Sequence, residues 1–277
     1  MGMADDYRKT IYGRPATVRT KLSLFDNHIA QFVRPQELDP FVGRVMAHWK
    51  EANLSTGTIK TLFCILKDFV KLAWERDLDT KRLNFIHFGD RAKPQNRIKA
   101  WNKGQVKIAL AGAESDPELY CVMMVALGTG MRRGELFALT WADIDFIKGE
   151  LTISKSYDLD TGEVGPTKTK SIRSIQMSAK VAKIFEKCYA PGNGDEDICF
   201  KAFNPNQKLK ALCRKHKLPV LSFHDLRHTF ATTLLEGGIS PKWVSQQLGH
   251  AKLSTTFDTY WQCFAEKQNL DDMYTAI

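Results

Sequence analysis

The feature that most constrains the fold of this chain is a change in the spacing of its apolar residues. In the first quarter of the chain they recur every three or four positions, as on one face of a helix. A long stripe of this kind spans residues 59–73, and Ser55 or Thr56 precedes it as a candidate N-cap. These patterns predict packed helices over residues 17–76. A second, shorter stripe consists of Phe41, Val42, Val45, Met46 and Trp49.

The helical pattern stops at a segment that resembles a linker. Residues 89–99 contain one glycine, one proline and four basic residues, and only two of their side chains are apolar. We therefore expect two domains, one over residues 1–93 and one over residues 94–277. The first 16 residues are polar and basic, with Gly13 and Pro15, and are expected to form a loosely ordered basic tail.

The second part of the chain changes from helical to alternating spacing and back again. The alternation predicts short antiparallel strands. The alternating residues are Ile144, Phe146, Leu151, Ile153 and, after a polar turn, Ile172 and Ile175. Helices are predicted over residues 103–113, 117–127, 132–139, 178–189, 205–216, 225–236 and 241–248. The end of the chain, 262–275, is a further amphipathic candidate. The fold class is therefore mainly α with a small antiparallel β-sheet (α+β).

Composition favours a polyanionic partner and narrows the class of protein. The 277 residues carry a net charge of +9, from 40 basic and 31 acidic residues, although an ordinary basic surface has the same balance. Six scattered cysteines without a Cys-x-x-Cys pair indicate reduced thiols and neither a zinc site nor a disulfide framework. Because no apolar run is long enough for a membrane span or a signal peptide, we expect a soluble, cytoplasmic protein.

Three segments concentrate side chains that can bind an anion. In Thr129-Gly-Met-Arg-Arg-Gly-Glu-Leu136, Gly130 permits a turn and Arg132 opens a helix, with Glu135 three residues later. A cation is disfavoured at a helix N-terminus unless an anion compensates it. A surface salt bridge between Arg132 and Glu135 is the alternative, and Arg133 is the competing arginine.

The second segment, His224-Asp-Leu-Arg-His-Thr229, opens another predicted helix. His224 and Arg227, three positions apart, share one side of it. His224 and His228, four positions apart, could hold a metal, but no glutamate follows the first histidine and no third ligand is apparent. We therefore predict no metal and no cofactor.

The third segment runs from Ser240 through Leu248-Gly-His250 to Tyr260. Ser240-Pro241 is a good helix start, Gly249 makes a turn and Ser254 could cap a second helix. Taken alone, this is the pattern of a DNA-reading helix-turn-helix.

A lysine-rich segment, Gly165-Pro-Thr-Lys-Thr-Lys-Ser-Ile-Arg173, lies between two predicted strands. It lacks the order and the strand-to-helix setting of a nucleotide-binding loop. Lysines at such a tip commonly only keep a hairpin soluble.

These four segments, in the order in which they follow one another along the chain, resemble those of the tyrosine recombinase (phage integrase) family. The resemblance is strong over residues 103–260 and weak over residues 17–76. The resemblance implies a helical core-binding domain, a catalytic domain, and DNA cleavage and rejoining through a 3′-phosphotyrosine without metal or ATP. It assigns phosphate binding to Arg132, Arg227 and His250, acid/base or phosphate contact to His224, bracing to Glu135, and nucleophilic attack to Tyr260. Lys168, with Lys170 as the alternative, would protonate the leaving 5′-oxygen. The alternative nucleophiles are Tyr157 and Tyr274.

The resemblance also implies how the protein binds its substrate. We expect double-stranded DNA with paired inverted half-sites, a tetramer on two duplexes that is weak or monomeric when free, a mobile genetic element as origin, and room for accessory DNA-bending proteins. Little sequence precedes Thr17, so we expect a short recombinase or one trimmed at its front. A catalytically idle DNA-binding regulator and a type IB topoisomerase-like enzyme are the rival functions. The candidate DNA-contacting residues are Lys60, Lys67, Lys71, Arg91, Lys93, Arg97 and Lys99.

Overall fold

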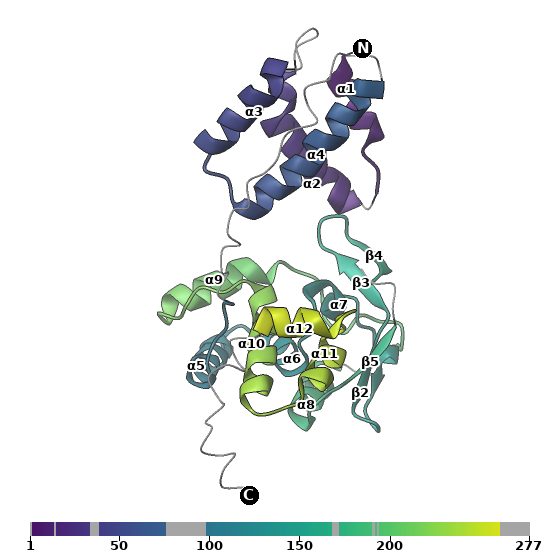
Figure 1. The fold of residues 1–277 in the computed structure, drawn as a ribbon. Coiled ribbons are helices and arrows are strands. Elements are labelled where there is room, and N and C mark those ends of the chain that lie inside the picture. The colour runs from purple at the N-terminus through teal and green to yellow at the C-terminus, as the bar shows by residue number, and fades with distance from the viewer. Residues whose placement is uncertain are drawn as a thin grey trace, which may run out of the picture. The chain divides into compact units, whose positions relative to one another are not determined.

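The computed structural model forms two compact units, Met1–Pro94 and Gln95–Ile277 (Figure 1). It describes residues 2–13, 15–33, 39–75, 98–167, 172–189, 192 and 194–260. The described chain is mostly helical with small antiparallel sheets, which confirms the predicted fold class.

The N-terminal unit consists of helices around an aromatic core. Tyr7, Phe25 and Phe69 stack with ring centroids 4.7–5.4 Å apart, and Phe41 joins them at 5.6 Å from Phe69. Ser55 is the cap of the last helix, because its Oγ accepts a hydrogen bond of 3.1 Å from the backbone N–H of Thr58. The elements are α1 (Met3–Thr10), α2 (Pro15–His28), η1 (Ala30–Phe32), α3 (Asp39–Glu51) and α4 (Thr56–Glu75).

The expectation that the first 16 residues are loosely ordered was wrong. Helix α1 forms there because Tyr7 gives it an apolar anchor: the side chain is buried and its hydroxyl donates to the carbonyl of Ile65 at 3.1 Å. A single aromatic residue among charged neighbours leaves little periodic signal, which is why the helix was not predicted.

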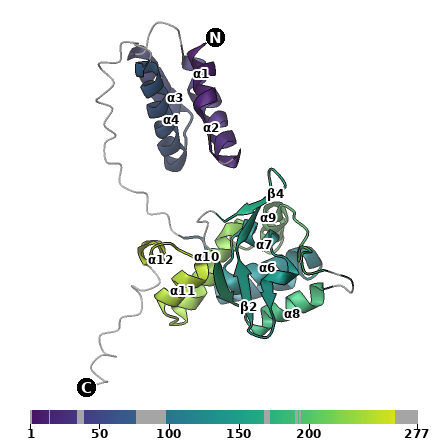
Figure 2. The same ribbon diagram turned by 90° about the vertical axis from the view of Figure 1, so that its right-hand side faces the viewer.

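In the C-terminal unit, helices surround the central helix α6 (Pro117–Thr129), as Figure 2 shows. Side chains on all sides of α6 are buried, and it packs against several of the other helices. The chain enters this unit at Trp101, whose backbone N–H donates to Thr229 Oγ1 and whose indole N–H donates to the carbonyl of Pro219. The other helices are α5 (Lys103–Ala113), α7 (Arg133–Phe137), η3 (Trp141–Asp143), α8 (Ala179–Cys188), α9 (Pro205–Lys215), α10 (Phe223–Glu236), α11 (Pro241–Leu248) and α12 (Leu253–Tyr260).

Two antiparallel sheets follow α7. Strands β1 (Ile144–Asp145), β2 (Glu150–Ile153) and β5 (Arg173–Gln176) form one, in the order β1-β2-β5. The other is a hairpin of β3 (Lys155–Asp158) and β4 (Glu163–Pro166), which was not predicted because its strands lack apolar alternation. Two residues of the alternating pattern lie just outside the paired strands and are exposed, Phe146 at 44% and Ile172 at 74%.

The helices of this unit begin and end close to the predicted positions, with one informative difference. Arg132 is the N-cap of α7 rather than a residue of its first turn, and its backbone is extended (φ −71°, ψ 150°). The predicted helix at 262–275 lies outside the described residues.

Candidate active site

A buried carboxylate organises the first part of the site. Glu135, 3% exposed, accepts hydrogen bonds from the backbone N–H of Arg132 at 2.9 Å and from its Nη1 at 2.8 Å. Both carboxylate oxygens also accept from Arg173, at 3.0 and 2.7 Å. Burial alone would raise the pKa of Glu135, but Arg173 and then Arg132 hold it below its usual value. Glu135 is therefore an anion clamped between two guanidinium groups, and the predicted bracing role has a physical basis.

Sequence reasoning missed Arg173 as a site residue. It begins β5, at the end of the lysine-rich segment, and its side chain is 11% exposed. It also packs on Gly249, where an added Cβ would lie 2.7 Å from Arg173 Nε. Arg173 thus joins the Glu135 end of the site to the loop that carries His250. Its position at the start of a strand was visible in the sequence, but its partner 38 residues away was not.

Arg227 ties two loops together from the middle of the site. It lies on α10, 3% exposed, and donates from Nη1 to the carbonyl of Gly130 at 2.8 Å and from Nη2 to the carbonyl of Leu248 at 2.7 Å. Gly130 is in the left-handed region (φ 67°), and an added Cβ would meet the Phe230 ring. A guanidinium has five N–H donors, so these two bonds leave others for a phosphate.

His250 follows the left-handed Gly249, and α12 fixes the orientation of its ring. Its Nδ1 lies 2.8 Å from Thr256 Oγ1, and Thr256 is fully buried. Burial, followed by Arg227, Arg132 and other cationic neighbours, lowers the pKa of His250 to about 4. The ring is therefore uncharged at neutral pH in the free protein.

Tyr260, at the end of α12, turns inward and is 1% exposed. Its hydroxyl lies 2.8 Å from His228 Nδ1, and its ring packs in a cluster with α10 and α11 residues such as Phe230 and Leu248. This burial argues against the helix-turn-helix alternative, because α12 presents its end residue to α10 rather than to an external groove. His224, on the same helix as His228, is more exposed, and the two rings meet edge to face at 5.2 Å between centroids.

Two of the predicted residues, Arg132 and Arg227, form a positively charged group with Arg173, and Arg227 is also coupled to the Tyr260 phenol. Burial, then Arg132, lowers the pKa of Arg227 to about 10, with an opposing contribution from Tyr260. Desolvation, then His228 and Arg227, lowers the pKa of His224. The cationic groups therefore disfavour one another's charge in the free protein. A bound anion would relieve this repulsion, as expected of a phosphate site.

Not all predicted contacts can be located. Lys168, its alternative Lys170, and Arg91, Lys93 and Arg97 lie outside the described residues. The remaining four candidate DNA contacts are all exposed, which suits a solvated face as well as a phosphate contact. They are Lys60, Lys67, Lys71 and Lys99.

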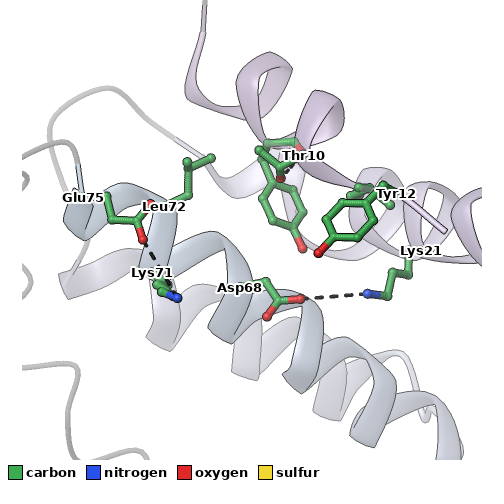
Figure 3. A pocket seen from close by; sticks show the side chains of 9 residues that line it. Thr10, Tyr12, Lys21, Asp68, Lys71, Leu72 and Glu75 are labelled. Atoms are coloured by element: carbon green, nitrogen blue, oxygen red, sulfur yellow. Dashed lines mark hydrogen bonds and ion pairs between the residues drawn. The ribbon is translucent and has the colours of Figure 1, made fainter.

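A separate open cavity of about 520 Å³ lies in the N-terminal unit (Figure 3). Its charged side chains form pairs along its wall, Lys21 with Asp68 at 3.9 Å and Lys71 with Glu75 at 4.0 Å. Tyr12 at its edge is 89% exposed. None of the residues that line this cavity belongs to the candidate site around Arg132, Arg227, His250 and Tyr260.

Two further classes of site, a metal cluster and a membrane span, are absent from the described part of the chain. No group of three or more His, Cys, Asp or Glu side chains there could hold a metal ion. None of the helices in the described ranges has the length and apolar content needed to span a bilayer.

Comparison with known proteins identifies the family. The model of the phage integrase family matches residues 102–267, more than half of the chain. The chain is 24% identical to the ICEBs1 integrase of Bacillus subtilis, over 95% of this chain and 79% of that protein. It is 27% identical to a XerC-like tyrosine recombinase of Caldanaerobacter subterraneus, over 74% of this chain and 62% of that protein.

Solved structures show the same fold. The Tn1549 transposon integrase, in complex with transposon right-end DNA, superposes with a TM-score of 0.75 at 22% identity, covering 94% of this chain and 95% of that one. XerH recombinase bound to its difH substrate gives 0.65 at 17% identity, covering 94% and 79%. With the matched segment containing Arg132, Arg227, His250 and Tyr260, the chain belongs to the phage integrase family of tyrosine recombinases, enzymes that cut and rejoin DNA.

Proposed function

We propose that this protein is a site-specific recombinase that cuts double-stranded DNA with Tyr260 and rejoins it to a different end. The observation that carries the proposal is an electrostatically coupled group: Arg227 is coupled to Arg132 and to the buried phenol of Tyr260, and His250 is coupled to both arginines. Burial first, and repulsion from neighbouring cations second, lower the pKa values of Arg227 and His250, and the repulsive part favours an anion beside them. A phosphodiester offers the non-bridging oxygens that guanidinium forks recognise.

The proposed reaction conserves the energy of the phosphodiester. Tyr260 Oη attacks phosphorus, the bond from phosphorus to the 5′-oxygen breaks, and a 3′-phosphotyrosine forms. The leaving 5′-oxygen takes up a proton, and we assign Lys168 as its donor. Negative charge grows on the equatorial oxygens during attack, and Arg132, Arg227 and His250 stabilise it. A 5′-hydroxyl from another duplex then reverses the step, which needs neither ATP nor an oxidant.

We further propose that both units bind DNA. The relatives are integrases, recombinases and transposases, and the solved neighbours were captured on DNA. The net charge of +9 suits a polyanion. The N-terminal helices, with exposed lysines at 60, 67 and 71 on α4, would be the core-binding domain. Exchange between two duplexes calls for paired half-sites and a tetramer, with the segment after Tyr260 docking on a neighbouring protomer.

The experiment is the capture of covalent adducts on a library of genomic DNA fragments. The protein is incubated with the library, denatured, and the protein-linked fragments are sequenced at their cut points. Wild-type protein should give a 3′-linked adduct that survives boiling in detergent and maps to few sites. Tyr260→Phe should bind DNA but give no adduct, while Tyr189→Phe, a control at a half-exposed tyrosine that follows α8 and packs on Trp141, should behave as wild type. An adduct with Tyr260→Phe assigns the nucleophile elsewhere.

Assembly separates recombination from topoisomerase-like relaxation. The substrate for this test is DNA that carries two half-sites identified by the adduct capture. A recombinase should join two such duplexes into one complex and exchange their strands. An enzyme that relaxes supercoils without pairing duplexes refutes the recombinase proposal and supports the topoisomerase-like alternative.

A further inference from the structure

The proposed nucleophile meets a histidine to which the sequence assigned no role in the reaction. His228 Nδ1 lies 2.8 Å from Tyr260 Oη, and the two rings are 5.7 Å apart between centroids. His228 follows Arg227 directly and lies one helical turn after His224 on α10. The phosphate-binding arginine and the partner of the nucleophile are therefore adjacent residues on one rigid helix.

The surroundings of His228 favour an uncharged ring. Burial lowers the pKa of the His228 ring. Asp225 opposes this shift, and Arg227 adds to it. In a neutral imidazole one nitrogen carries a proton and the other a lone pair. A phenol meeting such a ring can donate its proton to the nitrogen that lacks one. Because Nδ1 is the atom that faces Oη, the arrangement suits a Tyr260 that donates and a His228 that accepts.

We propose that His228 is a catalytic residue that receives the phenolic proton of Tyr260 during DNA cleavage. The inference rests on the proposed function, in which Tyr260 is the nucleophile. As the bond from Oη to phosphorus forms, the proton moves from Oη to His228 Nδ1 and the bond from phosphorus to the 5′-oxygen breaks. The leaving oxygen takes a different proton, from its own donor. When the 5′-hydroxyl attacks in reverse, Nδ1 returns its proton to Oη.

This assignment divides the work between the two histidines of α10. His224 is the more exposed of the two. Desolvation, then His228 and Arg227, with a smaller part from Arg132, lower its pKa, so we place it beside the two arginines as an uncharged phosphate contact. His228 faces the phenol. The resemblance allowed an acid/base role for His224. In our proposal His228, and not His224, accepts the proton of the attacking Tyr260 oxygen.

The first test needs no DNA. Nitrogen-15 NMR of the full chain, labelled at histidine, reports which ring nitrogen of His228 carries the proton. We expect the proton on Nε2, with Nδ1 shifted by its hydrogen bond, and we expect Tyr260→Phe to move the Nδ1 signal toward that of a free imidazole nitrogen. A proton on Nδ1 in wild-type protein overturns the proposal, because that nitrogen would then have no lone pair to offer.

The second test measures single-turnover cleavage of the DNA site found by adduct capture. His228→Ala removes the ring, and His228→Asn keeps an acceptor near the Nδ1 position but cannot take up a proton. Loss of general-base catalysis typically costs about 10²–10⁴-fold in rate, so both variants should cleave at least about 100-fold more slowly. Thr233→Ala, five residues along the same helix, is the matched control and should cleave normally. A cleavage rate of His228→Asn within about threefold of wild type overturns the proposal, because a hydrogen bond without proton transfer would then be enough for catalysis.

A substrate with sulfur in place of the bridging 5′-oxygen separates the two proton transfers. A thiolate leaves without being protonated, so sulfur should restore cleavage to a Lys168→Ala variant. It should not restore His228→Asn, whose defect is in the attacking group. Restoration of His228→Asn by sulfur refutes the assignment. An adduct formed by Tyr260→Phe in the same assay would instead refute the proposed function, so the two failures are distinguishable.

Discussion

Replacing Glu135 with glutamine tests whether the site is held together by its buried anion. The carboxylate accepts four hydrogen bonds, two from Arg132 and two from Arg173. Glutamine has nearly the same shape, but one of its terminal atoms is a donor. Whichever way the amide is turned, two N–H donors would face an NH₂ group, and both guanidinium groups would lose the buried negative charge.

The size of the effect follows from these contacts. Two hydrogen bonds to a charged group are lost, at about 1.5–3 kcal/mol each, which gives about 3–6 kcal/mol. Removing one partner of a buried ion pair costs a similar ~3–5 kcal/mol, because the other charge stays behind uncompensated. With an m-value of about 2 kcal/mol per molar urea, the unfolding midpoint of the C-terminal unit should fall by roughly 2 M.

Urea unfolding followed by tryptophan fluorescence measures this, because Trp101 and Trp141 are buried in the C-terminal unit. Glu186→Gln, at an exposed position of α8, is the matched control and should change the free energy of unfolding by less than about 0.5 kcal/mol. The pKa of Glu135 is lowered in the folded state from 4.5. Its contribution is therefore complete above pH 4.5 and is lost as the pH falls through the lower folded pKa.

The difference between wild type and Glu135→Gln should accordingly shrink in acid, and the shrinkage should begin below pH 4.5. A free energy of unfolding equal to that of the Glu186→Gln control at neutral pH would mean that the carboxylate does not hold the two arginines. A loss that persists unchanged to pH 3, well below the ordinary range of glutamate, would point to packing rather than charge.

Other perturbations have equally definite outcomes. Gly130→Ala should destabilise the C-terminal unit by more than about 1–2 kcal/mol, from the left-handed backbone and the contact with Phe230, and unchanged urea unfolding would contradict this. Gly134→Ala would place a Cβ 2.5 Å from Ser156 Oγ, so it should displace β3 and slow DNA cleavage; wild-type rates would show that β3 can move freely. The ring of His250 should titrate near pH 4 in the DNA-free protein, and an NMR midpoint above about 6 would contradict its burial among cations. Cleavage should persist in excess chelator, because cationic side chains supply the charge stabilisation; activity restored only by magnesium refutes a metal-independent reaction.

The parts of the fold that could be predicted are those encoded locally. Helix α6 begins at Pro117 after the N-cap Asp116 and ends at Gly130, and each of these signals lies within a few residues of the boundary that it sets. The same holds for α10, where Ser222 and Asp225 form a capping box. Arg227 was singled out because the His224-to-Arg227 segment resembles that of the tyrosine recombinases, and the spacing of the two residues fits one helix face.

The parts that were missed depend on contacts between distant residues. Arg173 acquires its role only when β5 brings it beside Glu135, and an isolated arginine at a strand start does not encode that. The hairpin of β3 and β4 is held against α7 because Gly134 lets the two backbones approach closely, while its own strands are half exposed. His228 was considered only as a metal ligand, since its hydrogen bond to Tyr260 spans 32 residues.

The two carbonyl groups that accept hydrogen bonds from Arg227 affect how lost activity can be inferred from the sequences of related proteins. Its guanidinium joins the main chain at Gly130 to the main chain at Leu248, so Arg227 holds the scaffold together besides its proposed role in binding phosphate. A descendant that had lost Tyr260, and with it all strand cleavage, would still need this arginine to fold. Retention of Arg227 is therefore a poor sign of surviving activity, and relatives with lost activity should be sought by the fate of Tyr260 and His228 instead.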